Sequence, residues 1–166
     1  MREPLPEILP ADPLPLLAQW LEEAKPVVKT PTAMALATVA ADGSPTVRMV
    51  ICRGFDVALG WLVFYSDRYW STRPLDARVA AAASDQSRPI ASRQAFLEKI
   101  EATRQTHGAE VPRPKRWGGY RVWAERVELW VGQPGRAHDR AVWTRALQPT
   151  EAGFTGGSWR GTRLQP

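Results

Sequence analysis

Residues 117–140, WGGYRVWAERVELWVGQPGRAHDR, join strand-forming sequence to a compact polar cluster. The runs at 120–123 and 126–131 are rich in β-branched and aromatic residues, which favours strands. The cluster RAHDR at 136–140 places His138, one of only two histidines, between arginines. Arginine forks bind phosphate and indole rings give flat apolar contact, so the segment suits a planar, anionic, heteroaromatic ligand. The indoles belong to Trp117, Trp123 and Trp130. The alternative is a strand, a Gly-Pro turn and a solvated basic segment.

The flanking sequence predicts further strands in an antiparallel arrangement. Met34–Val39 is almost wholly apolar, which is typical of a strand buried on both faces. The Asp42-Gly43 pair is a turn signal, and Thr46–Arg53 would form the second strand of a hairpin. A third strand at Trp61–Tyr65 follows at short spacing, which favours an antiparallel sheet or barrel. Toward the C-terminus we expect strands at Ala141–Arg145 and Ser158–Leu164, with a turn at Gly153–Gly157.

Helical signals occur in three places and make the fold class α+β. Residues 1–11 should form an extended arm, because their prolines prevent helix and ladder hydrogen bonds. Asp12 is the expected N-cap of a first helix, with Pro13 at the first helical position and leucines at helical spacing after it. Two more helices are expected, a short one at Asp76–Ala83 and a longer one that Ser92 caps and that runs to about His107.

The composition restricts the class of protein. The chain has 166 residues, of which 44% are hydrophobic and 23% charged, so we expect a single domain over residues 1–166. The net charge of +5 favours acidic partners. No Lys/Arg run or nucleic-acid module is recognisable, so a small phosphorylated molecule is expected rather than nucleic acid. Cys52, the single cysteine, excludes a disulfide framework and a Cys-rich zinc site, and we assign no metal. A lone cysteine and the lack of any run of transmembrane length predict a cytoplasmic protein without a membrane partner.

Several collinear stretches resemble one known family. RMVICRGFD at 48–56, the Tyr-Ser pair at 65–66 and YWSTRP at 69–74 match it in order. SDQSRPIASR at 84–93 is a close match, and VELW followed by RAHDR within 127–140 resembles the family signature. The chain is thus similar to the pyridoxamine 5′-phosphate oxidases, flavoproteins with a split β-barrel that act as homodimers. The resemblance implies an antiparallel split barrel with flanking helices that binds flavin mononucleotide (FMN).

The resemblance also implies an FMN site. Most of its residues would lie on the second strand, and Gln86 and Ser87 would reach the flavin from the partner subunit or across the barrel. The implied contacts are Arg48, Met49, Val50, Ile51, Cys52, Arg53, Tyr65, Ser66, Gln86, Ser87, Trp130 and Arg140.

Pyridoxamine or pyridoxine 5′-phosphate is the implied substrate, with O2 as the electron acceptor and pyridoxal 5′-phosphate as the product. The substrate phosphate would contact Arg53, Tyr69 and Arg73. Arg136 and His138 would act as the catalytic pair, lying over the substrate ring beside the flavin. The cofactor would perform the hydride transfer, while the protein orients the reactants.

One internal segment of the family is absent after Ser66. In the family it holds two strands and a Ser-Arg-Lys motif for the flavin phosphate, whereas here only Asp67 and Arg68 precede Tyr69. Either the remaining strands rejoin in a smaller sheet, or the dimer supplies the missing edge, or the chain is an incomplete relative. Two alternative functions therefore stay open. One is a related FMN oxidase of the phenazine-biosynthesis type, and the other is a non-catalytic remnant that binds flavin or pyridoxal phosphate.

Overall fold

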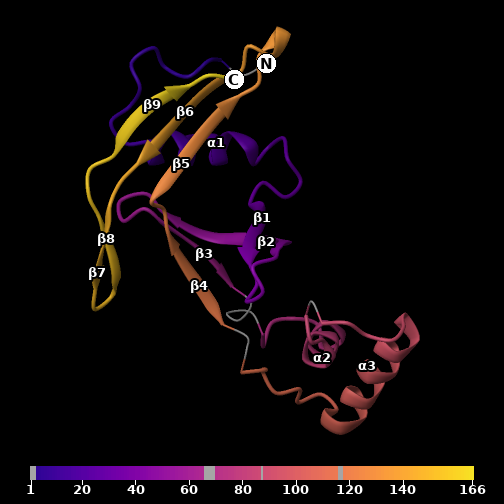
Figure 1. The fold of residues 1–166 in the computed structure, drawn as a ribbon. Coiled ribbons are helices and arrows are strands. Elements are labelled where there is room, and N and C mark those ends of the chain that lie inside the picture. Colours follow the sequence, from indigo (N-terminus) through magenta and orange to yellow (C-terminus); the bar gives the residue numbers. More distant parts are fainter. Residues whose placement is uncertain (1–2, 66–69, 87, 116–117) are drawn as a thin grey trace. The chain divides into compact units, whose positions relative to one another are not determined.

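The computed structural model describes residues 3–65, 70–86, 88–115 and 118–166, which form two compact units (Figure 1). The larger unit comprises the described parts of Met1–Phe64 and Tyr120–Pro166, and the smaller unit comprises those of Tyr65–Gly119. Among the described residues, no helix is both long and apolar enough to cross a membrane.

A four-stranded antiparallel sheet occupies one part of the larger unit. Its order is β1 (Ala33–Val39), β2 (Pro45–Asp56), β3 (Trp61–Tyr65) and β4 (Gly119–Trp123). The β1–β2 turn forms at the predicted Asp42-Gly43 pair, where Gly43 has a φ of 84° and the Asp42 carboxylate accepts from the backbone N–H of Ser44. The β2–β3 register shifts between Cys52 and Gly54, which makes a β-bulge.

Strands β3 and β4 pair directly in this sheet. Phe64 and Tyr120 stack across the pair, with ring centroids 5.3 Å apart and an interplanar angle of 19°. Of the three arrangements left open by the sequence, the remaining strands rejoin in a smaller sheet. The described strands do not close into a barrel, but the antiparallel α+β class is confirmed.

A second antiparallel sheet has the order β5 (Arg126–Val131), β6 (Asp139–Thr144) and β9 (Arg160–Leu164). A 3-10 turn, η1 (Pro134–Arg136), lies between β5 and β6. Strands β7 (Leu147–Thr150) and β8 (Gly153–Gly156) form a separate hairpin.

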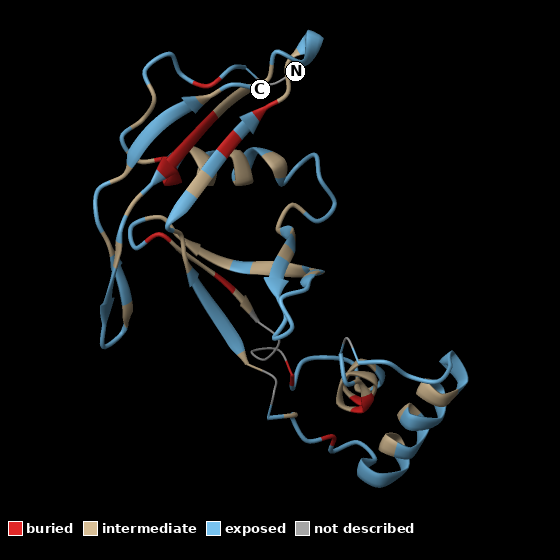
Figure 2. Cartoon of the chain, viewed as in Figure 1, coloured by how far each residue is buried: buried red, intermediate tan, exposed pale blue. Residues whose placement is uncertain are grey.

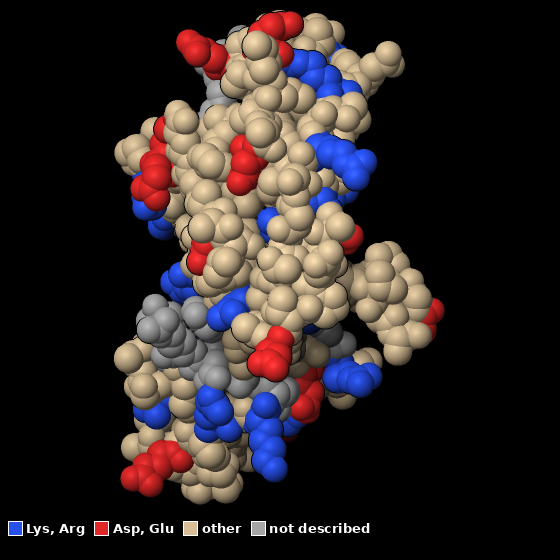
Figure 3. All heavy atoms as spheres, turned by 90° about the vertical axis from the view of Figure 1, so that its left-hand side faces the viewer, with Lys and Arg blue, Asp and Glu red and all other residues tan. Residues whose placement is uncertain are grey.

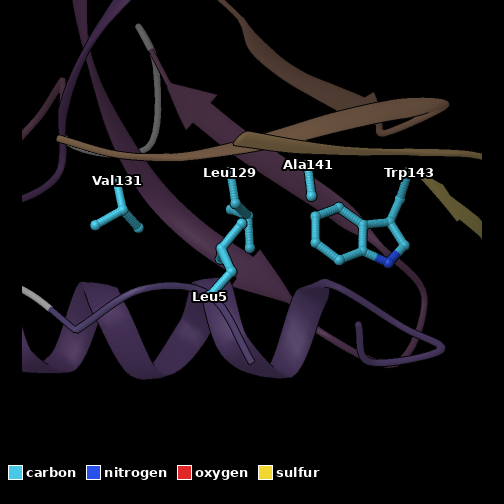
Figure 4. Packing of buried hydrophobic residues seen from close by; sticks show 5 residues of the cluster. All are labelled: Leu5, Leu129, Val131, Ala141 and Trp143. Carbon is cyan, nitrogen blue, oxygen red and sulfur yellow. The ribbon is translucent and has the colours of Figure 1, made fainter. Parts of the chain in front are cut away.

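Helix α1 (Leu14–Ala24) covers one face of the three-stranded sheet and creates the main core. Figure 4 shows Leu129, Val131, Ala141 and Trp143 directed from the strands toward this helix. Leu16, Leu17 and Trp20 of the helix pack against that cluster. Buried residues accordingly gather on β5 and β6 in Figure 2, and Trp143 is fully buried. Burial of these apolar side chains is the main term that stabilises this part of the chain.

The predicted N-terminal arm is part of this core. Leu5 is buried in the same cluster, and its backbone N–H donates to the Asp139 carboxylate at 2.7 Å. The indole N–H of Trp143 donates to the Pro10 carbonyl at 2.8 Å. Residues without helix or strand hydrogen bonds of their own are thus held by side chains of β6.

The smaller unit contains two helices, α2 (Leu75–Ala83) and α3 (Arg93–His107). The predicted cap of α3 is confirmed, because the Ser92 hydroxyl accepts from the Ala95 N–H at 3.0 Å. Trp70, Val79 and Val111 form a small hydrophobic core within this unit. The Trp70 indole N–H donates to the Val111 carbonyl.

Three sequence-based expectations need correction. Met34–Val39 is not buried on both faces, since β1 alternates between exposed and half-buried residues in this sheet. Gly153–Gly157 is not simply a turn, because Gly153–Gly156 pairs with Leu147–Thr150 as a hairpin. The helix starts one residue later than expected, so Pro13 takes the cap position while the Asp12 carboxylate accepts from the Leu14 N–H. The sequence did not predict the β7–β8 hairpin because few of its residues are bulky and apolar. The alternation of apolar and polar residues that indicates a strand is therefore weak there.

Arg145, directly after β6, joins the two sheets of the larger unit. Its guanidinium donates to the carbonyls of Ala124 in the β4–β5 turn and Gly60 in the β2–β3 turn, at 2.8 and 3.1 Å. It also lies over the Trp159 ring, 4.4 Å from the centroid. Burial lowers the pKa of Arg145 because desolvation disfavours the cation, and the Asp12 carboxylate offsets part of this shift.

We predict that Arg145→Met lowers the free energy of unfolding by about 2–4 kcal/mol, because it leaves two carbonyls without their charged donor. Arg145→Lys should recover only part of this loss, since one ammonium does not reproduce a planar fork. Urea denaturation followed by tryptophan fluorescence measures both. The exposed Arg160 provides the control, because Arg160→Met should change the value by less than about 0.5 kcal/mol. An Arg145→Met variant as stable as this control would contradict the role of Arg145.

Candidate functional site

The alternation along β5 determines where Trp130 lies. Leu129 and Val131 are buried in the main core, so Trp130 between them is directed to the opposite face, where it is 53% exposed. Arg140 on β6 is its direct cross-strand partner and shares that face. Because the core residues fix the register, the outward placement of this large indole is imposed by the packing beneath it.

The β5–β6 connection holds the predicted Arg136 and His138 in a tight, irregular turn. Gly135 and Arg136 have successive positive φ values of 65° and 63°. The left-handed conformation suits glycine, but for Arg136 it costs about 1–2 kcal/mol. Strain of this kind is often found at functional sites, where the surrounding structure enforces it.

His138 packs against Trp130 at the end of this turn. The ring centroids lie 4.7 Å apart with an interplanar angle of 43°. The backbone N–H of Gln133 donates to Nδ1 of His138 at 3.2 Å. The imidazole is therefore held on one side by an indole face and on its edge by the main chain.

Arg140 is held by a partner that the sequence reasoning missed. Its Nε and Nη2 atoms donate to Oε1 of Glu128 at 2.9 and 2.7 Å, and Nη1 donates to the Gln165 carbonyl at 3.2 Å. A carboxylate two residues before an outward-facing Trp130 lies on the same face of the strand, so alternation indicates the face of Glu128 but not its cross-strand partner. The contacts fix the guanidinium beside the indole.

The β2 residues of the predicted FMN site are divided between two faces of the sheet. Arg48 is half-buried, and its Nη2 donates to the hydroxyls of Thr38 and Thr46 at 3.3 and 3.2 Å. Met49 lies on the other face and is 69% exposed. Arg53 falls at the β-bulge, where the ladder is interrupted and a side chain is redirected. Val50, Ile51 and Cys52 are half-buried between these positions.

Other predicted residues belong to the smaller unit or lie outside the described chain. Arg73 follows the Trp70 turn and Gln86 lies in the α2–α3 connection, and both are exposed. Ser66, Tyr69 and Ser87 lie outside the described residues, as does Trp117. Tyr65 ends β3, and its side chain is not described.

The structure brings together Trp130, His138 and Arg140, but Trp123 lies elsewhere. The Trp123 ring packs edge-on against Phe154 of β8, with centroids 5.4 Å apart. The expected wall of tryptophans beside the basic cluster is thus wrong for Trp123. Trp123 is the last residue of β4, and the sequence pattern did not reveal its contact with the β7–β8 hairpin.

Neither surface charge nor surface shape indicates a ligand site elsewhere as clearly as the packing of His138 on Trp130 does. On the face seen in Figure 3, Lys and Arg are interspersed with Asp and Glu rather than gathered in one basic surface. An open hollow of about 560 Å3 lies beside Arg145 and is lined by Glu125, Ser158 and Arg160 among others. None of the predicted site residues lines it.

The chain was compared with known proteins. It is 34% identical over 203 residues to a pyridoxine/pyridoxamine 5′-phosphate oxidase of Gluconobacter oxydans, covering 95% of this chain and 96% of that protein. The enzyme of the same name from Chromobacterium violaceum is 35% identical over 208 residues, covering 96% and 93%. The chain belongs to the pyridoxine/pyridoxamine 5′-phosphate oxidase family. Residues 117–166 match the pyridoxine 5′-phosphate oxidase C-terminal dimerisation region, which includes Trp130, Arg136 and His138.

Two solved structures share the fold of this oxidase-family chain. PhzG from Burkholderia lata 383, in complex with tetrahydrophenazine-1-carboxylic acid, is 24% identical with a TM-score of 0.68, covering 95% of this chain and 94% of that one. A pyridoxamine 5′-phosphate oxidase-related, FMN-binding protein from Nostoc punctiforme PCC 73102 is 14% identical with a TM-score of 0.56, covering 96% and 100%. At these identities the likeness concerns the fold alone.

The comparisons also show that this family member is shortened internally. The Gluconobacter alignment is 203 residues long and the chain has 166, so at least 37 aligned positions are gaps in this chain. A missing internal segment is therefore confirmed, and its position after Ser66 remains a prediction.

The strain at Arg136 yields a prediction. Arg136→Gly should raise the free energy of unfolding by about 0.5–1 kcal/mol, because glycine adopts a φ of 63° without a Cβ penalty, although its flexible unfolded state reduces the gain. Arg136→Ala is the matched control, since alanine keeps the strained Cβ. Chemical denaturation compares the two, and equal stability of the glycine and alanine variants would contradict the strain.

Proposed function

We propose that this chain is an FMN-dependent oxidase that converts pyridoxamine or pyridoxine 5′-phosphate to pyridoxal 5′-phosphate with O2 as electron acceptor. The observation that carries the proposal is the packing of His138 on the exposed Trp130, beside the strained Arg136. A flat aromatic surface beside cationic and imidazole groups fits an anionic heteroaromatic ring. The names of the family's relatives supply the substrate class.

The described residues fit the ring part of an FMN molecule. Trp130 offers a flat exposed face, and Arg48 and Arg140 offer guanidinium donors held by neighbouring oxygens. When bound, FMN would accept a hydride from the substrate's 4′ carbon and pass the electrons to oxygen. The remaining proposed FMN contacts of β2 are Met49, Val50, Ile51, Cys52 and Arg53.

The roles of the chain's own residues follow from their chemistry. Arg53 and Arg73 would bind the substrate phosphate, together with Tyr69. Arg136 and His138 would lie on the substrate ring and hold it against the flavin, which raises the rate by orientation rather than by a chemical step of their own. In this proposal, the strain at Arg136 is retained because it directs the guanidinium to the ligand.

We also propose that two copies of this chain assemble. One face of the β1–β2 hairpin carries Ala35, Val39, Val47 and Met49, and the last three are 74%, 67% and 69% exposed. Contiguous apolar surface of this kind is typical of a protein interface. The match of residues 117–166 to a dimerisation region supports a second copy as its partner.

Two specific observations support other functions. The likeness to PhzG, whose structure holds a tetrahydrophenazine carboxylic acid, favours a related oxidase that acts on a phenazine-type ligand. The gap of at least 37 positions favours a non-catalytic remnant that binds flavin or pyridoxal phosphate, since part of the FMN phosphate site would be lost with the segment.

Visible spectroscopy distinguishes these functions. The purified chain titrated with FMN should show a saturable change of the flavin bands, and the complex should consume oxygen when pyridoxamine 5′-phosphate is added. Binding of FMN with turnover of a tetrahydrophenazine carboxylic acid, and none of pyridoxamine 5′-phosphate, would support the PhzG-like function. Binding of FMN without any turnover would support the non-catalytic remnant. The absence of any spectral change with FMN would overturn both oxidase functions.

Single substitutions test the assigned roles. His138→Ala and Arg136→Ala should each lower kcat/KM for pyridoxamine 5′-phosphate by about tenfold or more, equivalent to about 1.4 kcal/mol of transition-state binding. Both should leave the dissociation constant of FMN within about threefold of the unaltered chain, a change of less than about 0.7 kcal/mol. His107→Ala is the matched control, because this exposed histidine ends α3. Equal losses of FMN binding and turnover would contradict a substrate role for Arg136 and His138.

A further inference from the structure

We infer that the main chain of the β5–β6 turn fixes His138 as the neutral tautomer with its proton on Nε2, so that this residue serves as a hydrogen-bond donor to the ligand. Gln133 supplies the fixing group through its backbone, and Gly132 and Trp130 are positioning residues. The donor role rests on the proposed function, whereas the tautomer is a property of the chain itself.

The direction of one hydrogen bond carries the inference. The backbone N–H of Gln133 lies 3.2 Å from Nδ1 of His138 and has only a proton to offer. Nδ1 must therefore present its lone pair, and a neutral imidazole then carries its proton on Nε2. A hydroxyl or water at this place would adapt to either tautomer, but a backbone N–H does not. Within the described residues, Nε2 has no hydrogen-bond partner.

The ring is also held against rotation. Its centroid lies 4.7 Å from that of Trp130, so the indole covers one face of the imidazole. Gly132 lies close to the same indole. A Cβ built at position 132 would stand 3.3 Å from Cη2 and 3.4 Å from Cζ3 of Trp130. A side chain at position 132 would press on the indole and through it on His138. A small residue suits this close approach, because the indole would have to shift by a few tenths of an ångström to admit a Cβ.

The consequence for the site is chemical. An Nε2 atom that already carries a proton does not accept another from the substrate, so His138 is not the proton acceptor at that atom. It instead donates to an acceptor oxygen of an anionic heteroaromatic ligand, either a ring oxygen or a phosphate oxygen. The site would then select substrates that place an acceptor atom at hydrogen-bond distance from the Nε2–H of His138.

Nitrogen-15 NMR of the flavin-free chain tests the tautomer. The chain has only two histidines, so a His107→Gln variant assigns the spectrum, and His107 serves as the exposed reference in the unaltered chain. The spectra are recorded at pH 8, above the ordinary histidine pKa of about 6.5. We expect the ratio of Nε2–H to Nδ1–H tautomer at His138 to exceed that at His107 by about fivefold, as one ordinary hydrogen bond supports. Equal ratios at the two histidines would overturn the inference.

Two sets of variants complete the test. Gly132→Val should bring the His138 ratio toward that of His107, while Gly118→Ala, where a Cβ meets nothing within 4 Å, should leave it unchanged. In turnover assays His138→Gln, which retains an N–H donor, should keep at least about tenfold more kcat/KM than His138→Glu, which at pH 8 only accepts. Equal turnover of the Gln and Glu variants would overturn the donor role. A chain that keeps the tautomer ratio but neither binds FMN nor turns over would refute the proposed function and leave the tautomer assignment standing.

Discussion

The larger unit depends on one half-buried cation at the junction of its four-stranded and three-stranded sheets. The guanidinium of Arg145 donates to the carbonyls of Gly60 and Ala124, which belong to turns at the ends of the four-stranded sheet. Its own strand, β6, lies at the centre of the three-stranded sheet. A Cβ at Gly60 or Gly156 would stand 2.3 or 2.2 Å from the nearest guanidinium atom, so a side chain at either position would displace Arg145. By holding the β4–β5 turn at Ala124, Arg145 also fixes the position where β5, the strand that carries Trp130, begins.

From that corner, packing determines the candidate site. The side chains of Leu129 and Val131 enter the core under α1, and the period of two along a strand then directs Glu128 and Trp130 to the opposite face. A slip of one residue would bury Trp130 and expose the core side chains, so the register is strongly specified. The irregular turn after β5 brings His138 back onto this indole. The candidate site is thus a product of core packing and of a short loop.

The internal shortening has a structural answer in the described chain. In the described chain β3 pairs directly with β4, and the rings of Phe64 and Tyr120 stack across the pair. The sheet is smaller, and its outer strands keep one unpaired edge each within the described residues. The described sheet therefore stays continuous from β1 to β4. This separates the question of folding from the question of cofactor binding.

The sequence by itself determined the family, the antiparallel α+β class and most elements, because motifs such as RAHDR and strand periodicity are local properties. It also identified Trp130, Arg136 and His138 as one cluster, since they are close along the chain. Only the tertiary structure decided that Arg140 binds Glu128, that Arg145 joins two sheets and that Trp123 packs on Phe154. Those contacts join residues from separate elements, and their geometry depends on packing that no local pattern encodes. The tautomer of His138 belongs to the same class, because a single backbone N–H, placed by the turn, determines it.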